Sequence, residues 1–100
     1  MFRYNRTMEQ KRTIEILKAL ADETRLGVVR KLARETTCQP SCDLIETCAS
    51  KQQLSQPAMS HHFSKLVDAG VVLEEKRGTQ KVYTLNRELL QSIGVDVTKL

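Results

Sequence analysis

Hydrophobic residues recur at the 3.6-residue spacing of α-helices through the first two thirds of the chain. Polar stretches separate these repeats, and within each repeat the apolar positions share one helical face. The polar residues 1–7 are expected to form a loose arm ahead of the first helix. The pattern predicts helices over residues 8–21, from Glu23 through Ala33, over 42–51 and over 55–69.

Residues with helix-capping side chains stand at the ends of the predicted helices. Asp22, Ser41 and Ser55 precede the second, third and fourth helices, where a side-chain oxygen accepts a hydrogen bond from a free backbone N–H. Gly70 follows the fourth helix as a C′ residue, because glycine adopts positive φ without strain. The polar residues 50–53 are expected to form the turn between the third and fourth helices.

The spacing of the apolar residues changes after the fourth helix. β-favouring runs at 71–75 and 81–85 flank a short basic segment, 76–80, that contains one glycine, and this arrangement predicts a hairpin. Helical spacing then returns over 87–93. We therefore expect a mainly α fold with a small β-hairpin, in the order α-α-α-α-β-β-α, within one domain that covers residues 1–100.

The predicted fourth helix is apolar on one side and carries short polar side chains on the other. Met59, Phe63 and Leu66 form the apolar side. A helix fits the major groove of B-DNA, where an outer face of this kind contacts base edges and phosphates. Adjacent helical side chains diverge by about 100°, so the two histidines favour DNA contact or packing over joint metal binding. The DNA-binding candidates are Ser55, Gln56, Ser60, His61, His62, Ser64 and Lys65.

The predicted hairpin places a basic tip directly after this helix. A basic two-stranded tip beside a groove-reading helix is typical of a wing, which follows the adjacent minor groove or the phosphate backbone. Together, the polar-faced helix, the glycine stop and the basic hairpin predict a winged helix-turn-helix that binds double-stranded operator DNA. The tip residues expected to contact DNA are Lys76, Arg77, Gly78, Thr79, Gln80 and Lys81.

Composition narrows the classes of function. The net charge of +4 over 100 residues suits a polyanionic partner, while 4% aromatic residues and no Trp argue against a stacking platform for single strands. No stretch approaches the roughly 20 apolar residues of a membrane span, and the N-terminus lacks the pattern of a secretory signal. We therefore expect a cytoplasmic protein with no membrane partner. A chain this short buries a limited core, which partner subunits often complete.

Two segments of the sequence resemble the ArsR family of winged helix-turn-helix repressors. Leu17-Lys-Ala-Leu-Ala-Asp-Glu-Thr-Arg-Leu26 is similar to the family's opening signature, and Leu54–Leu66 with Asp68-Ala-Gly-Val-Val72 is similar to its recognition helix. The resemblance implies a homodimer held by helices 8–21 and 87–93. It also implies repression that a small effector relieves, most often a metal or metalloid ion. The dimer-interface residues expected on this basis are Ile14, Leu17, Leu89, Leu90 and Ile93.

Three cysteines, Cys38, Cys42 and Cys48, are the candidate sensor residues. In metal-sensing relatives a Cys-x-Cys pair precedes Asp-Leu, whereas here Pro40 stands where the first of those cysteines would be. Three thiolates suit a thiophilic metal or metalloid ion, because soft ions select sulfur ligands.

Two other interpretations of the cysteines stay open. Cys42 begins the predicted third helix, where the thiolate is favoured, and Cys38 in the preceding loop could pair with it in a redox- or persulfide-responsive repressor. Alternatively the cysteines sense nothing, and Cys48 is a small core residue.

Other classes of protein have less support. The chain lacks a Cys-x-x-Cys pair, a glycine-rich phosphate loop and an acid–base pair beside a cysteine, so we expect no enzyme activity. A protein-interaction module that keeps the winged fold without DNA binding is the remaining alternative, since a fold does not fix a function. Such a module would show no salt-dependent affinity for duplex DNA.

Overall fold

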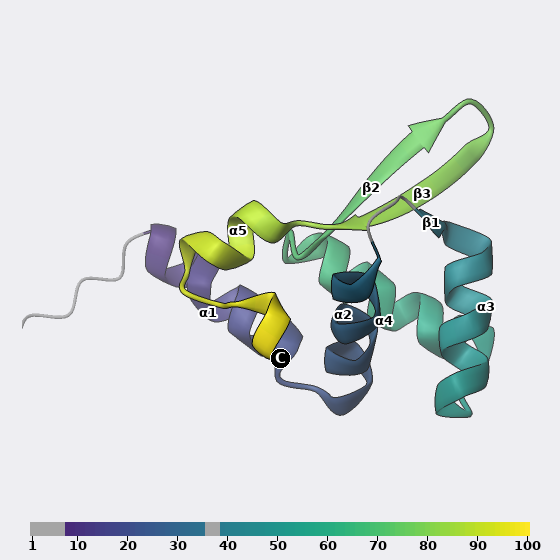
Figure 1. The fold of residues 1–100 in the computed structure, drawn as a ribbon, viewed down its shortest axis with the longest axis horizontal. Coiled ribbons are helices and arrows are strands. Elements are labelled where there is room, and N and C mark those ends of the chain that lie inside the picture. Colours follow the sequence, from purple (N-terminus) through teal and green to yellow (C-terminus); the bar gives the residue numbers. More distant parts are fainter. Residues whose placement is uncertain (1–7, 36–38) are drawn as a thin grey trace, which may run out of the picture.

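The computed structural model describes residues 8–35 and 39–100, and within them the predicted order of four helices, a hairpin and a fifth helix is confirmed (Figure 1). The arm predicted at 1–7 and the loop residue Cys38 lie outside these ranges. None of the helices in the two ranges has the length and apolarity needed to span a membrane. The elements are α1 (Met8–Leu20), α2 (Glu23–Arg34), β1 (Gln39–Pro40), α3 (Ser41–Gln52), α4 (Gln56–Asp68), β2 (Val72–Arg77), β3 (Gln80–Leu85), α5 (Arg87–Ser92) and the 3-10 helix η1 (Val97–Lys99).

The capping side chains fix the start of two helices as predicted. Asp22 accepts a hydrogen bond from the Arg25 backbone N–H at 2.9 Å and begins α2. Ser55 Oγ accepts one from the Ala58 N–H at 3.2 Å and begins α4. Gly70 follows the last residues of α4 with φ 82°, a left-handed conformation that glycine adopts without a Cβ clash.

The prediction for the ends of α3 is wrong at both termini. Ser41 is the first helical residue rather than the cap, because the extended backbone of Pro40 leads directly into the helix without a side-chain hydrogen bond. The helix also continues to Gln52, past the start of the predicted turn, and Gln53 ends it at φ 56°. The Gln52 amide donates to the Thr24 carbonyl of α2 at 3.1 Å, a long-range contact that stabilises the last turn of α3.

A three-stranded antiparallel sheet extends the predicted hairpin. Residues predicted as a five-residue turn belong largely to the strands, since β2 continues to Arg77 and β3 begins at Gln80. The turn is only Gly78 and Thr79, and Gly78 at φ 65° provides the positive dihedral that such short turns need. Gln39–Pro40, for which the sequence pattern predicts no strand, pairs with β3 as an edge strand, a position that tolerates proline.

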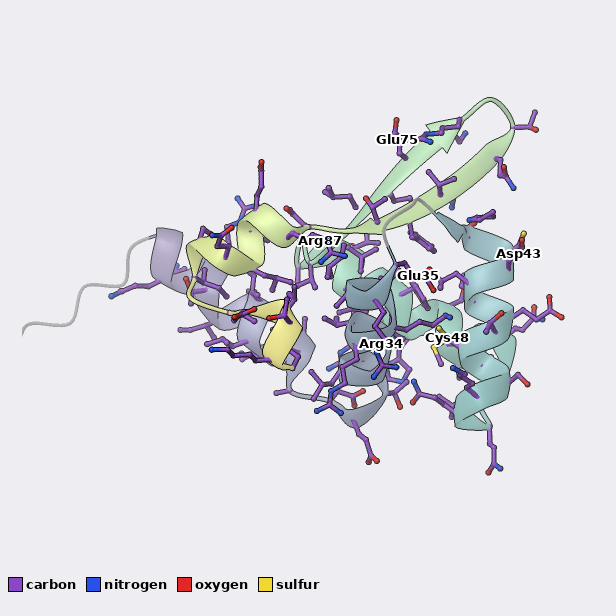
Figure 2. The ribbon with its side chains drawn as sticks, viewed as in Figure 1. Arg34, Glu35, Asp43, Cys48, Glu75 and Arg87 are labelled. Carbon is purple, nitrogen blue, oxygen red and sulfur yellow. The ribbon has the colours of Figure 1, made fainter. Side chains whose placement is uncertain are left out.

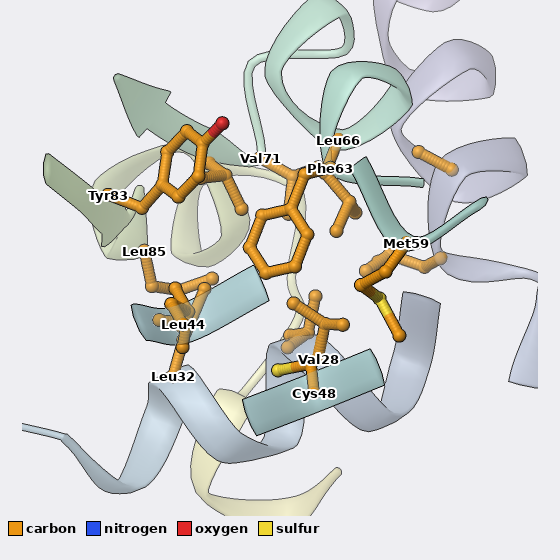
Figure 3. Close-up of a cluster of buried hydrophobic side chains, with 14 of the residues drawn as sticks. Val28, Leu32, Leu44, Cys48, Met59, Phe63, Leu66, Val71, Tyr83 and Leu85 are labelled. Atoms are coloured by element: carbon orange, nitrogen blue, oxygen red, sulfur yellow. The ribbon is translucent and has the colours of Figure 1, made fainter. Parts of the chain in front are cut away.

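The apolar side of α4 lies at the centre of the core. Met59, Phe63 and Leu66 are fully buried, and Figure 3 shows the Phe63 ring in the middle of the cluster. The Phe63 and Tyr83 rings stack with centroids 5.0 Å apart, so α4 is fixed against the base of the hairpin. Val28 of α2 belongs to the same cluster. This packing leaves the opposite side of α4 to solvent.

α5 connects the hairpin to the end of α2. The Arg87 guanidinium at its start donates to the carbonyls of Leu32, Ala33 and Glu35 at 3.3, 3.1 and 2.9 Å (Figure 2). These carbonyls lie at the end of α2, where backbone acceptors run out of intrahelical donors, although Leu32 O also accepts the Glu35 backbone N–H at 3.1 Å. Leu90 of α5 is fully buried in the core.

Candidate nucleic-acid interface

The outer side of α4 carries exposed polar side chains at helical spacing. The N-terminal cap and the packing of Phe63 place this surface opposite the core. Ser55 is exposed as well, but its Oγ already accepts the capping hydrogen bond from the Ala58 N–H. We call this surface the α4 polar face; its exposed members are Gln56, Ser60, His61, Ser64 and Lys65.

His62 does not belong to the α4 polar face. Its side chain is only 22% exposed, and its Nδ1 lies 3.2 Å from Arg25 Nη1 and 3.8 Å from Asp22 Oδ2. The neighbouring His61 ring is tilted 58° from it, with the centroids 6.4 Å apart. His62 therefore packs toward the corner between α1 and α2, and its contact with DNA stays a prediction. Sequence spacing could not reveal Arg25 and Asp22 as its partners.

The tip of the β2–β3 hairpin projects away from the helices (Figure 1). It is exposed along both strands, and Lys76 and Lys81 stand opposite each other across the ladder. This surface, the wing tip, comprises Lys76, Arg77, Gly78, Thr79, Gln80 and Lys81.

Acidic side chains beside the wing tip reduce its net positive charge. The prediction from the sequence did not take them into account. Lys81 Nζ lies 2.9 Å from Glu74 Oε1, and this hydrogen bond raises the pKa of the lysine. Arg77 Nη2 lies 3.7 Å from Glu75 Oε2. Both pairs are largely exposed, so solvent screens them and a phosphate can compete for the cations. The sequence already indicated these ion pairs, since Glu74 and Glu75 fall within the predicted first strand, next to the basic tip.

The cysteines that the structure describes have different surroundings. Cys42 is exposed at the start of α3, with its Sγ 3.7 Å from Asp43 Oδ1. Cys48 is 3% exposed and lies on the side of α3 that faces α2, whereas Asp43 points away (Figure 2). Burial raises the pKa of the Cys48 thiol, although Lys31 and Lys51 oppose the shift.

The two cysteines on α3 are six positions apart, which separates their Cα atoms by roughly 9 Å along the helix axis. One ion cannot bind both sulfurs within a subunit at that spacing without distortion of the helix. Within residues 8–35 and 39–100, no three His, Cys, Asp or Glu side chains gather as a metal site. The third candidate, Cys38, falls in the gap between these ranges.

The residues proposed for the dimer interface divide into two groups. Ile14 and Leu17 are 42% and 48% exposed and lie three positions apart on α1, so they are neighbours on the helix surface. Leu89 of α5 and Ile93, which follows the helix as its C-cap, are partly buried against the core. Leu90 is fully buried within the subunit, so the expectation that a partner contacts it is wrong. It occupies the inner side of a short helix whose direction the sequence alone did not fix.

Comparisons with known proteins agree with this geometry. A family model described as a helix-turn-helix domain matches residues 20–75. An arsenical resistance operon repressor of Staphylococcus xylosus is 40% identical over 87 residues, which cover 87% of this chain and 78% of that protein. The corresponding repressor of Escherichia coli is 41% identical over 73 residues, covering 73% and 58% of the two chains.

Solved structures provide a second comparison. HlyU from Vibrio cholerae superposes with a TM-score of 0.63 at 28% identity, covering 86% of this chain and 88% of HlyU. A homodimeric winged helix-turn-helix DNA-binding domain from Mycobacterium bovis superposes with a TM-score of 0.64 at 20% identity, covering 83% and 72%. The second likeness concerns the fold alone.

Proposed function

The chain belongs to the ArsR family of winged helix-turn-helix transcriptional repressors, and we propose that it binds operator DNA through the α4 polar face and the wing tip. The observation that carries this proposal is the division of α4 into two sides. Its apolar side is fully buried, and its polar side is exposed to solvent. A helix presented in this way fits the major groove of a duplex.

The chemistry of the α4 polar face suits base reading. Gln56 has both a donor and an acceptor and can pair bidentately with adenine, while Ser60 and Ser64 serve base edges or phosphates. His61 offers a further ring nitrogen from the same exposed side. Lys65, one turn beyond His61, adds a cation for the phosphate backbone.

The wing tip is assigned to phosphates, and a salt titration tests this assignment. Replacing Lys76 and Arg77 by alanine should weaken binding to specific and non-specific duplexes alike. The slope of log K against log salt should flatten by about 0.9 for each phosphate that the variant no longer neutralises. The measurement is a gel-shift or fluorescence-anisotropy titration at several salt concentrations.

Lys99 provides the matched control for the wing tip. Its side chain is 82% exposed on η1, so Lys99→Ala removes a positive charge outside the wing tip. The control should keep the parent slope. A wing-tip double variant that behaves like this control would refute the phosphate assignment.

Repression relieved by a trivalent metalloid is the effector mechanism that we propose. Its support is the similarity to repressors named for arsenical resistance, together with an exposed thiol at the start of α3. Soft ions select sulfur ligands, and Cys42 with Cys38 would supply thiolates. Cys48 is buried and its raised pKa keeps the thiol protonated, which makes it a poorer ligand.

Cysteine variants test the effector mechanism. Arsenite should weaken operator binding of the parent about 5- to 150-fold, the usual range of coupling between sites. Cys38→Ser and Cys42→Ser should each abolish the response, and Cys48→Ser should retain it. These values come from anisotropy titrations with and without arsenite. If all three variants respond as the parent does, the cysteines are not the sensor.

A further inference from the structure

A hydrogen-bonded corner joins three helices beside the α4 polar face. The Arg25 guanidinium donates from Nε to the Ala19 carbonyl at 2.7 Å and from Nη2 to the Lys18 carbonyl at 3.3 Å, both at the end of α1. Its Nη1 lies 3.2 Å from Nδ1 of His62 on α4. Asp22, the N-cap of α2, lies 4.0 Å from the same Nη1.

The chemistry of the pair settles the direction of the central hydrogen bond. A guanidinium has only donors, so Arg25 Nη1–H donates and His62 Nδ1 accepts. In this arrangement the ring hydrogen of His62 lies on Nε2. The Arg25 side chain is 12% exposed, which limits the water available to replace these bonds. The corner is therefore a directional contact of defined geometry.

Apolar packing fixes which side of α4 is buried, and a directional contact can define its rotation about the helix axis more closely. The contacts of Met59, Phe63 and Leu66 bury α4, but hydrophobic burial is not directional. A hydrogen bond from the middle of the helix to a fixed guanidinium does set a rotation about the helix axis. Because His62 directly follows His61, that rotation determines where the α4 polar face points.

We propose that Arg25 and His62 form a positioning latch that fixes the rotation of α4 and so aligns the α4 polar face with base edges. The inference rests on the proposed function, since it assumes that α4 reads DNA. It assigns His62 an indirect role, in contrast to its exposed neighbour His61. It also links α4 to α1, the helix that carries the exposed Ile14 and Leu17. The latch thereby orients α4 relative to the surface proposed for dimerisation.

Substitutions at His62 test the latch. The probe is a duplex that the parent protein selects from a random library, compared with a scrambled duplex of equal length. His62→Ala should lower affinity for the selected duplex about tenfold or more, the equivalent of one charge-assisted hydrogen bond, with little change for the scrambled duplex. His62→Asn keeps an acceptor near the Nδ1 position and should recover affinity to within about threefold of the parent.

Arg25→Lys provides an independent test through the partner residue. Lysine keeps the charge but has one nitrogen in place of the planar fork, so it cannot reach both the α1 carbonyls and His62. It should reduce the ratio of selected to scrambled affinity as His62→Ala does. The double variant Arg25→Lys/His62→Ala should be no worse than Arg25→Lys alone, because the arginine substitution already removes the contact with His62. Circular dichroism melting of each variant reports the folded fraction under the binding conditions.

The outcomes separate the latch from the proposed function. A parent protein that selects no sequence refutes the DNA-reading role of α4, and the latch with it. A selective parent whose affinity ratio is unchanged in His62→Ala and Arg25→Lys refutes the latch alone. If the variants lose affinity equally for both duplexes, in proportion to the fall in their melting temperatures, Arg25 and His62 have a purely structural role. That result would also overturn the latch. Selective loss in His62→Ala with recovery in His62→Asn supports it.

Discussion

Replacing Ile14 and Leu17 together by glutamate is expected to disrupt the homodimer that the sequence predicts and to abolish tight operator binding. Both side chains are exposed on α1, although a soluble subunit gains little from leaving large apolar groups in water. Buried carboxylates without partners would oppose association of two such surfaces. A dimer that engages two half-sites gains avidity, and its loss should weaken operator binding by on the order of 10²–10⁴-fold.

Light scattering after size exclusion measures the mass, and anisotropy with the selected duplex measures the affinity. Leu73 provides a matched control, because it is equally exposed at 48% but lies on β2 outside α1. Leu73→Glu should keep the mass of the parent. A doubly substituted protein that remains dimeric would show that subunits associate through another surface.

Phe63→Ala should produce the largest loss of stability of any single substitution on α4. Phe63 is fully buried, stacks on Tyr83 at 5.0 Å and lies in the middle of the core. Removal of such a ring costs about 3–5 kcal/mol, a large share of the about 5–15 kcal/mol that stabilises a typical domain. The free energy of unfolding is measured by urea titration at one fixed protein concentration, since association shifts apparent stability.

Two further substitutions control for the Phe63 effect. Phe63→Leu keeps most of the buried volume and should cost less than Phe63→Ala. Gln56→Ala lies on the exposed side of the same helix and should change stability by no more than about 0.5 kcal/mol. A loss in Phe63→Ala as small as that in Gln56→Ala would contradict the central place of this ring in the core.

Local signals predicted most of the fold. The caps at Asp22 and Ser55 and the glycine at position 70 fix helix ends through neighbours only a few residues away. β1 depends instead on pairing with β3, and the last turn of α3 on the Gln52 hydrogen bond to α2. Contacts between residues so distant in the sequence leave no periodic pattern.

The residues of the candidate site also divide into those that local sequence patterns predicted and those that depend on long-range contacts. The α4 polar face followed from helical spacing, because alternate sides of one helix separate by residue type. His62 could not be told from His61 by residue type, since its inward position brings it beside Arg25 of α2 and the N-cap residue Asp22. Leu90 likewise fits either an interface or a core until the position of α5 is known. Glu74 and Glu75 of β2, by contrast, could be identified from the sequence, and their ion pairs reduce the net positive charge of the wing tip.

Selection of duplexes from a random library, with the parent and with Gln56→Ala/Ser60→Ala, measures most directly whether the α4 polar face reads operator DNA. We expect the parent to select a defined sequence. The double variant should lose preference at the bases these side chains contact, by about 1–3 kcal/mol for each bidentate pair, and should keep the parent's salt slope. Selection of the same sequence at the same affinity by both proteins would contradict this account.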